Sequence, residues 1–263
     1  MSKAKIKYQG IQQTNEVVAS PNNNTFELNG DSYEVTKANV DSPVSGTIYG
    51  ALLNYKGALA SLGNAVNEAP YNEAPKAPIL YIKPVNTISS YGTPIPLPAG
   101  FPEVEIGASL GIVIGRNATR VTEDEALSYV AGYTIVNDVS IPHDSVYRPA
   151  ISQKARDGFC PVGPWVIERD SVTNPDALGI KVFINDELKQ ENNTSNLVRS
   201  VSRLLADVTD FMTLSEGDVL LVGVPENAPL AKDGDIVRIE IDGIGQLENS
   251  VKLEQEITKG ASK

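Results

Sequence analysis

Glycine and proline divide the chain into short segments, and this division limits the folds that it can adopt. The 21 glycines and 17 prolines are spread over the whole sequence. The apolar runs between them are short and rich in β-branched residues, which is typical of strands. Clear strand candidates are ILYIK at 79–83, LGIVI at 110–114 and YTIV at 133–136, followed near the end by 235–241 and 247–253.

Only two segments have well-marked helical spacing. Thr122 and Glu125 have the Thr-x-x-Glu pattern of a capping box, which predicts a helix over 123–130. The segment 195–212 predicts a second helix, because its apolar residues recur at helical spacing: Leu197, Val201, Leu204, Leu205, Val208 and Phe211. Two helices among many strands predict a mostly β, mixed α+β fold.

The first part of the chain has the pattern of a small structural unit of its own. Residues 6–8, 24–28 and 32–36 favour strands, and Asn29-Gly30 is a strong hairpin-turn signal. We predict a small N-terminal β subdomain over 1–48 and a main domain over 49–263. The alternative is that the first strands form an edge of the main domain.

The charge of the chain excludes several classes of partner. The formal net charge is −11 and the pI is near 4.6, so phosphate backbones and anionic membrane surfaces are repelled. We therefore expect no nucleic-acid and no membrane partner. A single cysteine, Cys160, and the lack of an apolar leader segment predict a cytoplasmic location. With one histidine as well, only carboxylates could form a metal site.

Five residues could carry chemistry on local grounds. Asp138 follows the strand 133–136, Lys83 ends the strand 79–83, and Lys154 lies in a polar segment. The aspartate is also typical of a turn, and each lysine is also typical of an exposed surface position. His143 stands next to Asp144, but adjacent side chains rarely point at one spot, so a solvated loop histidine is the simpler interpretation. Cys160 lies in an apolar run and is expected to be a packed thiol.

Several ordered segments together resemble the fumarylacetoacetate hydrolase family. They are GYTIVNDVS at 132–140, Lys154 with GFCPVGPW at 158–165, INDELKQ at 184–190, LSEGD at 214–218, GVP at 223–225 and IGQLEN at 244–249. Within that family, ALLNY at 51–55, YIKP at 81–84 and 137–150 are most similar to the first repeat of two-repeat isomerase/decarboxylases of homoprotocatechuate (4-hydroxyphenylacetate) breakdown. The resemblance implies a rolled mixed β-sheet that is typically dimeric.

The resemblance also implies a site. Family members hold Mg²⁺, Mn²⁺ or Ca²⁺ with two glutamates of a Glu-x-Glu strand and one aspartate, and the metal chelates a 2-oxo acid and stabilises an enolate. Asp138 matches the aspartate, and Lys154 matches a lysine that contacts substrate. Gln190 and Thr194 match a segment that lines the pocket. We expect Lys83 and Lys154 to be catalytic and to converge with Asp138 and Gln190 on one cleft.

The sequence departs from the family pattern at the metal. Counted back from 110–115, the two glutamate positions fall on Gly107 and Ser109. Glu103-Val104-Glu105 has the right spacing but begins four residues early, which is about 13 Å along a strand; only a bulge near Gly107 could bring Glu105 back. We therefore predict that a divalent metal binds weakly or not at all.

Two further departures concern the reaction. Ala58 stands where hydrolytic members carry a catalytic histidine, and Val224 replaces a common threonine, which argues against hydrolysis by that route. The expected function is an isomerase or decarboxylase, as an enzyme or a subunit of one, acting on a 2-oxo or 2-hydroxydienoate di- or tricarboxylate. The alternatives are a metal-free partner subunit of a metal-bearing homologue and a small dicarboxylate-binding module. We expect a homodimer or a hetero-oligomer with a metal-bearing family member.

Overall fold

The computed structural model describes residues 1–70, 72–143 and 150–261. The strands are β1 (Ser2–Tyr8), β2 (Thr14–Ser20), β3 (Thr25–Leu28), β4 (Asp31–Glu34), β5 (Val40–Asp41), β6 (Ile48–Leu52), β7 (Ile79–Lys83), β8 (Ile88–Ser89), β9 (Ile95–Leu97), β10 (Val104–Glu105), β11 (Ala108–Ile114), β12 (Val130–Asn137), β13 (Cys160–Glu168), β14 (Gly179–Ile184), β15 (Glu187–Asn193), β16 (Val219–Leu221), β17 (Leu230–Ala231), β18 (Ile236–Ile241) and β19 (Gly245–Leu253). The α-helices are α1 (Lys56–Ala60), α2 (Ile151–Lys154), α3 (Val201–Phe211) and α4 (Glu254–Ala261).

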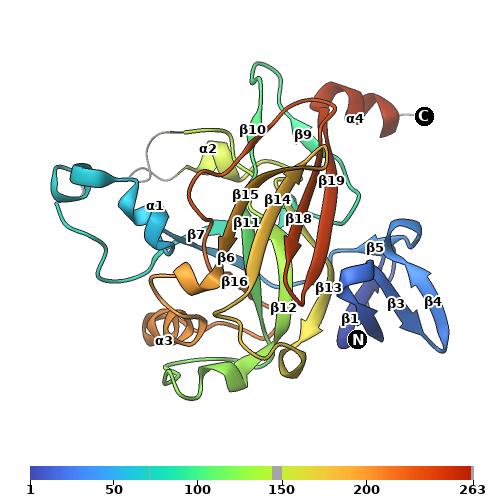
Figure 1. The fold of residues 1–263 in the computed structure, drawn as a ribbon, viewed down its shortest axis with the longest axis horizontal. Coiled ribbons are helices and arrows are strands. Elements are labelled where there is room, and N and C mark those ends of the chain that lie inside the picture. The colour runs from blue at the N-terminus through green and yellow to red at the C-terminus, as the bar shows by residue number, and fades with distance from the viewer. Residues whose placement is uncertain (71, 144–149, 262–263) are drawn as a thin grey trace.

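Two sheets form the body of the protein. A 12-stranded sheet follows the order β4-β3-β2-β1-β13-β12-β11-β16-β6-β7, with β5 and β8 attached, and a five-stranded sheet follows the order β15-β14-β18-β19-β9. The smaller sheet lies across β11, β12 and β13 (Figure 1), and β18 and β19 pack against β12. Most strand pairs are antiparallel, but β6 pairs with β16 in parallel, so the sheet is mixed as expected.

The core lies between these sheets because the central strands are apolar on both faces. Every residue of β11 is buried, and so are the predicted strand residues 133–136 of β12. Trp165 on β13 is fully buried and donates its Nε1–H to the Ile244 carbonyl oxygen at 2.7 Å, which ties the larger sheet to the smaller one. Gly245 leaves room for this indole, since a Cβ there would lie 3.1 Å from Trp165 Cζ2.

The helix predicted over 123–130 is wrong. The structure has only a short 3₁₀ helix at Ala126–Tyr129. Val130 is already the first residue of β12 and pairs with Ile114, which leaves too few residues for an α-helix. The Thr122 hydroxyl donates to the Glu125 carboxylate at 3.2 Å instead of capping a helix.

The second predicted helix is present but shorter than 195–212. It is α3, and its start is set by Ser200, whose hydroxyl accepts a hydrogen bond from the Arg203 N–H at 3.1 Å. Thr194–Asn196 forms a separate 3₁₀ helix before it. Four of the six apolar residues at helical spacing, Val201, Leu204, Leu205 and Val208, are buried within α3, whereas Phe211 is exposed.

The N-terminal strands join the large sheet at one end. β1 pairs with β13, and β2, β3 and β4 follow outward as antiparallel neighbours, set off to one side of the molecule (Figure 1). The hairpin signal is confirmed, because Asn29 and Gly30 connect β3 to β4 with φ angles of 54° and 91°. Strand β2 was not among the predicted strands. The division at residue 48 stays a prediction.

Candidate active site

Asp138 is the centre of the site and lies directly after β12. Its N–H donates to the Gly107 carbonyl oxygen at 2.8 Å, and the Asn137 side chain accepts from the Gly107 N–H at 3.1 Å. The two chain segments approach so closely that a Cβ at residue 107 would lie 2.4 Å from the Asp138 carbonyl oxygen. Glycine at 107 is therefore what lets β11 and β12 hold Asp138 in place.

Two ammonium groups and one hydroxyl surround the Asp138 carboxylate. Lys154 Nζ, at the end of α2, lies 2.8 Å from Oδ2, and Lys83 Nζ, at the end of β7, lies 3.0 Å from Oδ1. The Lys83 pair is not aligned as a hydrogen bond. The Tyr81 hydroxyl also donates to Oδ2. Tyr81 and Lys83 reach the same carboxylate because residues two apart on a strand share a face.

This arrangement sets the charges of the site. Burial by itself would raise the pKa of the Asp138 carboxyl, but the charges of Lys154 and Lys83 and the hydrogen bonds from Lys154 and Tyr81 hold that pKa well below its usual value. Burial, followed by the charge of Asp138, raises the pKa of Tyr81 well above its usual value, so its hydroxyl stays a donor.

A cleft of about 370 Å³ opens over this group. The residues that line it include Tyr81, Glu105, Asp138, His143 and Lys154, together with Ala58 and Val224 to Ala228. The Lys154 side chain is 12% exposed and the Lys83 side chain is 0% exposed, so only Lys154 of the two is open to the cleft. The Lys83 ammonium also donates hydrogen bonds to the carbonyl oxygens of Val139 at 3.0 Å and Lys154 at 2.7 Å.

The structure thus brings Lys83, Asp138 and Lys154 together, although the sequence separates them. Gln190 is not among the residues that line the cleft, but its Nε2 donates to the carbonyl oxygen of Glu226, which does line it, at 2.6 Å. Thr194 is buried outside the cleft, and its hydroxyl accepts from the Leu178 N–H at 2.8 Å. Asp144 and the segment 145–149, which contributed to the resemblance, lie outside the described residues.

Two residues of the cleft differ from the sequence-based expectation. Glu105 was expected to lie too far back along the strand unless a bulge near Gly107 brought it inward. In the structure β10 ends at Glu105 and β11 begins only at Ala108, and Glu105 lines the cleft that holds Asp138. Burial raises the pKa of Glu105 against the charges of Lys154 and His143. His143 was expected to be a solvated loop residue, yet its ring also lines the cleft.

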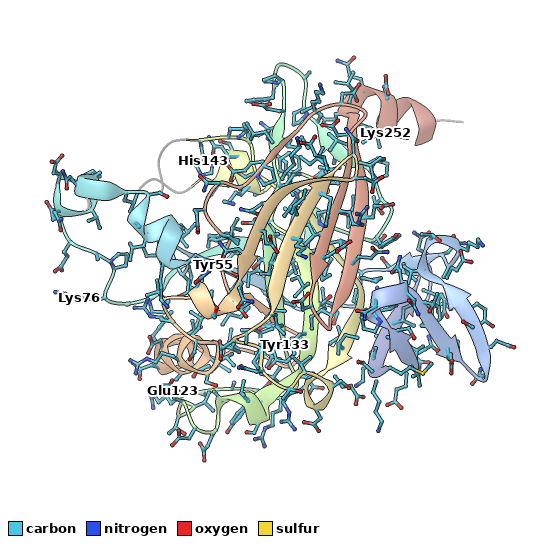
Figure 2. The ribbon with its side chains drawn as sticks, in the orientation of Figure 1. Tyr55, Lys76, Glu123, Tyr133, His143 and Lys252 are labelled. Atoms are coloured by element: carbon cyan, nitrogen blue, oxygen red, sulfur yellow. The ribbon has the colours of Figure 1, made fainter. Side chains whose placement is uncertain are left out.

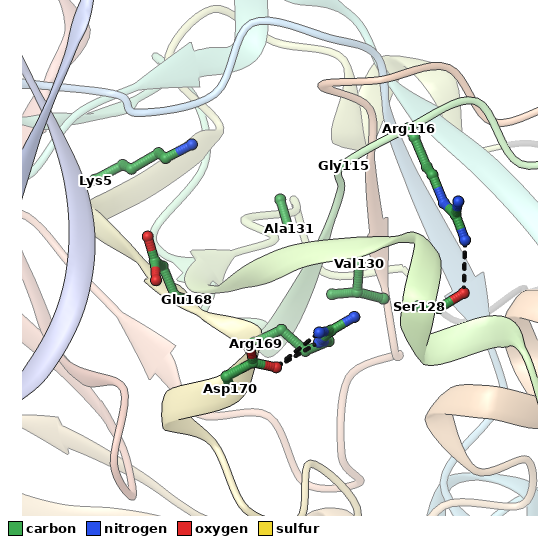
Figure 3. A pocket seen from close by; sticks show the side chains of 9 residues that line it. All are labelled: Lys5, Gly115, Arg116, Ser128, Val130, Ala131, Glu168, Arg169 and Asp170. Carbon is green, nitrogen blue, oxygen red and sulfur yellow. Dashed lines mark hydrogen bonds and ion pairs between the residues drawn. The ribbon is translucent and has the colours of Figure 1, made fainter.

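Other candidates do not belong to this site. The Cys160 thiol is fully buried, and burial raises its pKa to about 12, as expected for a packed thiol. A second hollow of about 250 Å³ is lined by Lys5, Arg116 and Arg169 among others (Figure 3). Its arginines already have partners: Arg169 pairs with Asp170 at 2.7 Å, and Arg116 donates to Ser128 at 2.8 Å. None of the predicted site residues lines this hollow.

The fold and the cleft define a β-rich protein with a carboxylate and lysine site at the edge of a rolled mixed sheet. The family model described as fumarylacetoacetate (FAA) hydrolase, C-terminal, matches residues 47–252. The chain belongs to the fumarylacetoacetate hydrolase family.

Three relatives show what the chain is similar to. It is 40% identical over 215 residues to the 4-hydroxyphenylacetate degradation bifunctional isomerase/decarboxylase of Escherichia coli, covering 82% of this chain and 49% of that protein. It superposes on 2-hydroxyhepta-2,4-diene-1,7-dioate isomerase from Mycobacterium marinum with a TM-score of 0.76 and 27% identity, over 97% of this chain and 99% of the other. It also superposes on maleylpyruvate hydrolase from Sphingobium sp. SYK-6, in complex with manganese(II) and pyruvate, with a TM-score of 0.70 and 29% identity, over 85% and 77% of the two chains. The chain spans about half the length of the curated relative.

The residues at Asp138 do not form the three-carboxylate metal site that the family resemblance implies. Gly107 has no side chain, and the Ser109 hydroxyl donates to the Gly223 carbonyl oxygen at 2.8 Å. Two ammonium groups occupy the space beside Asp138 that a cation would need. Within residues 1–70, 72–143 and 150–261, no three His, Cys, Asp or Glu side chains are grouped so that they could hold a metal ion.

In the same part of the chain, no helix is long and apolar enough to cross a membrane.

Proposed function

We propose that the chain is an isomerase/decarboxylase-type enzyme, or a subunit of one, that acts on 2-oxo or 2-hydroxydienoate di- or tricarboxylates in aromatic (4-hydroxyphenylacetate) catabolism. The observation that carries the proposal is the Asp138 carboxylate held between Lys83, Lys154 and Tyr81 at one wall of the cleft. The family match and the names of the relatives support the same class of reaction.

Each residue of the group has a distinct role in the proposal. Lys154 reaches the cleft and binds the carboxylate or oxo oxygen of the substrate, where a charge-assisted hydrogen bond is strong. Tyr81 keeps its proton and donates it to the Asp138 carboxylate. Lys83 and Asp138 are positioning residues, because their buried ion pair orients the Lys154 ammonium. Gln190 supports the cleft through its hydrogen bond to Glu226, and Thr194 contributes to the fold around Leu178.

The second part of the proposal is that this cleft works without a divalent metal of its own. Hard cations need several oxygen ligands with net negative charge. Only Asp138 of the three expected carboxylates is present, and its charge is already balanced by Lys83 and Lys154. A bound Mn²⁺ or Mg²⁺ would have to displace these ammonium groups, so we expect metal binding to be weak or absent.

A second candidate function is a partner subunit that completes a metal-bearing homologue. Two observations favour it: glycine and serine stand at the expected ligand positions, and the chain matches half of a two-activity relative. A simple dicarboxylate-binding module is the third candidate. Under any of these proposals we expect two chains to pair, as a homodimer or with a second family member.

One assay separates these functions. Chelator-treated protein is mixed with oxaloacetate, and the enol–keto conversion is followed by ultraviolet absorbance while released CO₂ is measured. The enzyme proposal predicts a rate above that of buffer without added Mn²⁺, and loss of that rate in Lys154→Met. A rate that appears only when a metal-bearing homologue co-purifies would favour the partner subunit. Binding of oxalate with no rate at all would favour the binding module.

A further inference from the structure

His143 brings an imidazole to the cleft from an unexpected position. It is the single histidine of the 263 residues, and it lines the same cleft as Glu105, Asp138 and Lys154. Ala58 also lines this cleft and has no group able to transfer a proton. A reaction that moves protons at neutral pH therefore has one imidazole available, and it lies beside the lysine that we assign to substrate binding.

The orientation of this imidazole is set by the backbone. Its Nδ1 lies 3.0 Å from the Ile141 carbonyl oxygen and 3.2 Å from the Ser140 hydroxyl. The Ile141 N–H in turn donates to the Gln153 carbonyl oxygen at 3.0 Å, which fixes this turn to α2. Figure 2 shows His143 next to this helix. A carbonyl oxygen only accepts hydrogen bonds, so the contact assigns the proton to Nδ1. In the neutral ring, Nε2 then carries the lone pair.

We propose that His143 is the proton-transfer residue of this cleft, an inference that rests on the proposed function. Nε2 removes the proton from the carbon next to the oxo group, and the C–H electron pair becomes the new C=C bond. The C=O π pair moves to the oxygen, whose negative charge faces Lys154. The imidazolium then returns its proton to that oxygen, giving the enol, or to another carbon of a conjugated acid, giving the isomer. No electrons are gained or lost.

The charges around His143 suit this cycle. The titratable groups that line the cleft with it are Glu105 on β10, Asp138 after β12, Lys154 at the end of α2, Tyr81 on β7 and Glu226. Glu105 interacts electrostatically with both Lys154 and His143. The imidazolium formed during transfer is therefore stabilised by a nearby carboxylate, while the substrate oxygen is stabilised by an ammonium.

The first arm of the test uses the enol–keto conversion of oxaloacetate. His143→Ala should lower the rate constant by about 10²- to 10⁴-fold, the usual contribution of a positioned acid–base group. Its affinity for oxalate, a mimic of the enolate, should stay within threefold, and added imidazole should restore part of the rate. A rate within threefold of the wild type would overturn the role of His143 but leave the proposed function standing. A loss that imidazole does not restore would also count against it, and an inactive wild type would overturn this inference together with the proposed function.

The second arm needs no turnover. With one histidine in the chain, long-range ¹H–¹⁵N spectra show a single imidazole and report its tautomer directly. The inference predicts the Nδ1-protonated tautomer and a shift of the Nε2 resonance when oxalate saturates the protein. The same titration of Lys154→Met should show no shift at equal oxalate concentration. A proton on Nε2, or an Nε2 resonance that oxalate does not move in the wild type, would overturn the inference.

Discussion

Lys83 and Asp138 form an ion pair of 3.0 Å in which neither side chain is exposed to solvent. Such a pair is stable only while both charges are present, because a single buried charge has lost its water without compensation. The pair is also the point where β7 is joined to the end of β12. It therefore links the stability of the fold to the position of Lys154, whose ammonium lies on the other oxygen of the same carboxylate.

Asp138→Asn should strongly destabilise the protein. The substitution leaves the Lys83 and Lys154 ammonium groups without a counter-charge, and breaking a buried pair in this way costs about 3–5 kcal/mol of unfolding free energy. Urea unfolding followed by fluorescence of Trp165 measures the change. Asp210→Asn, at an exposed position of α3, is the matched control and should change the unfolding free energy by less than about 0.5 kcal/mol. Equal effects of the two substitutions would contradict the assignment.

The stabilising contribution of Asp138 should depend on pH in a definite direction. Its folded-state pKa lies below the ordinary value of 3.8, so the contribution is complete above that value and is lost as the pH falls below it. The difference in unfolding free energy between the wild type and Asp138→Asn should therefore be constant from pH 7 to pH 5 and shrink below pH 4. A difference that grows on acidification would show that the carboxyl is not held ionised.

Lys154→Met should weaken oxalate binding. Removing one charge-assisted hydrogen bond costs about 1.5–3 kcal/mol, which corresponds to a rise in Kd of about 10- to 150-fold. Methionine keeps an unbranched apolar side chain that is one heavy atom shorter, so the change removes the ammonium without adding bulk. Calorimetric titration provides the Kd, and Lys252→Met, at an exposed position of β19, is the control. If both variants bind oxalate equally well, Lys154 is not the anion-binding group.

The chain should pair in solution. It aligns with 49% of its two-activity relative, so two copies restore the length of that protein. A pairing of this kind needs a large interface that persists at micromolar concentration. Light scattering should return twice the chain mass of 28.1 kDa. A mass of one chain, in the absence of a second family member, would contradict this expectation.

The sequence predicted those parts of the fold in which local pattern and tertiary environment agree. The run at 110–114 is apolar at every position because β11 is buried on both faces, and Asn29-Gly30 forms a turn that requires positive φ angles. The capping pattern at 122–125 gave a wrong prediction of a helix, because a capping box indicates where a helix can begin and not whether the chain has room for one. Val130 belongs to β12, and this tertiary pairing overrides the local signal.

The site was predicted in part, for reasons that concern distance along the chain. Lys83, Asp138 and Lys154 were expected to meet because of the family resemblance, and no local pattern could have joined them. Tyr81 could have been recognised, since it shares a strand face with Lys83. The sequence allowed for Glu105 only through a bulge near Gly107, and the break at Ile106–Gly107 is what gives it access to the cleft. His143 could not be placed from the sequence, because its access depends on the turn that follows Asp138.

The central claim is that lysine ammonium groups, and no divalent metal, hold the anionic substrate in this cleft. Calorimetric titration of chelator-treated protein tests it directly, first with oxalate in the presence of EDTA and then with Mn²⁺ alone. The claim predicts saturable oxalate binding in EDTA, with a Kd that added Mn²⁺ changes by less than threefold, and no stoichiometric Mn²⁺ site of micromolar affinity. A micromolar Mn²⁺ site that is lost in Asp138→Ala, with oxalate bound only when Mn²⁺ is present, would contradict it.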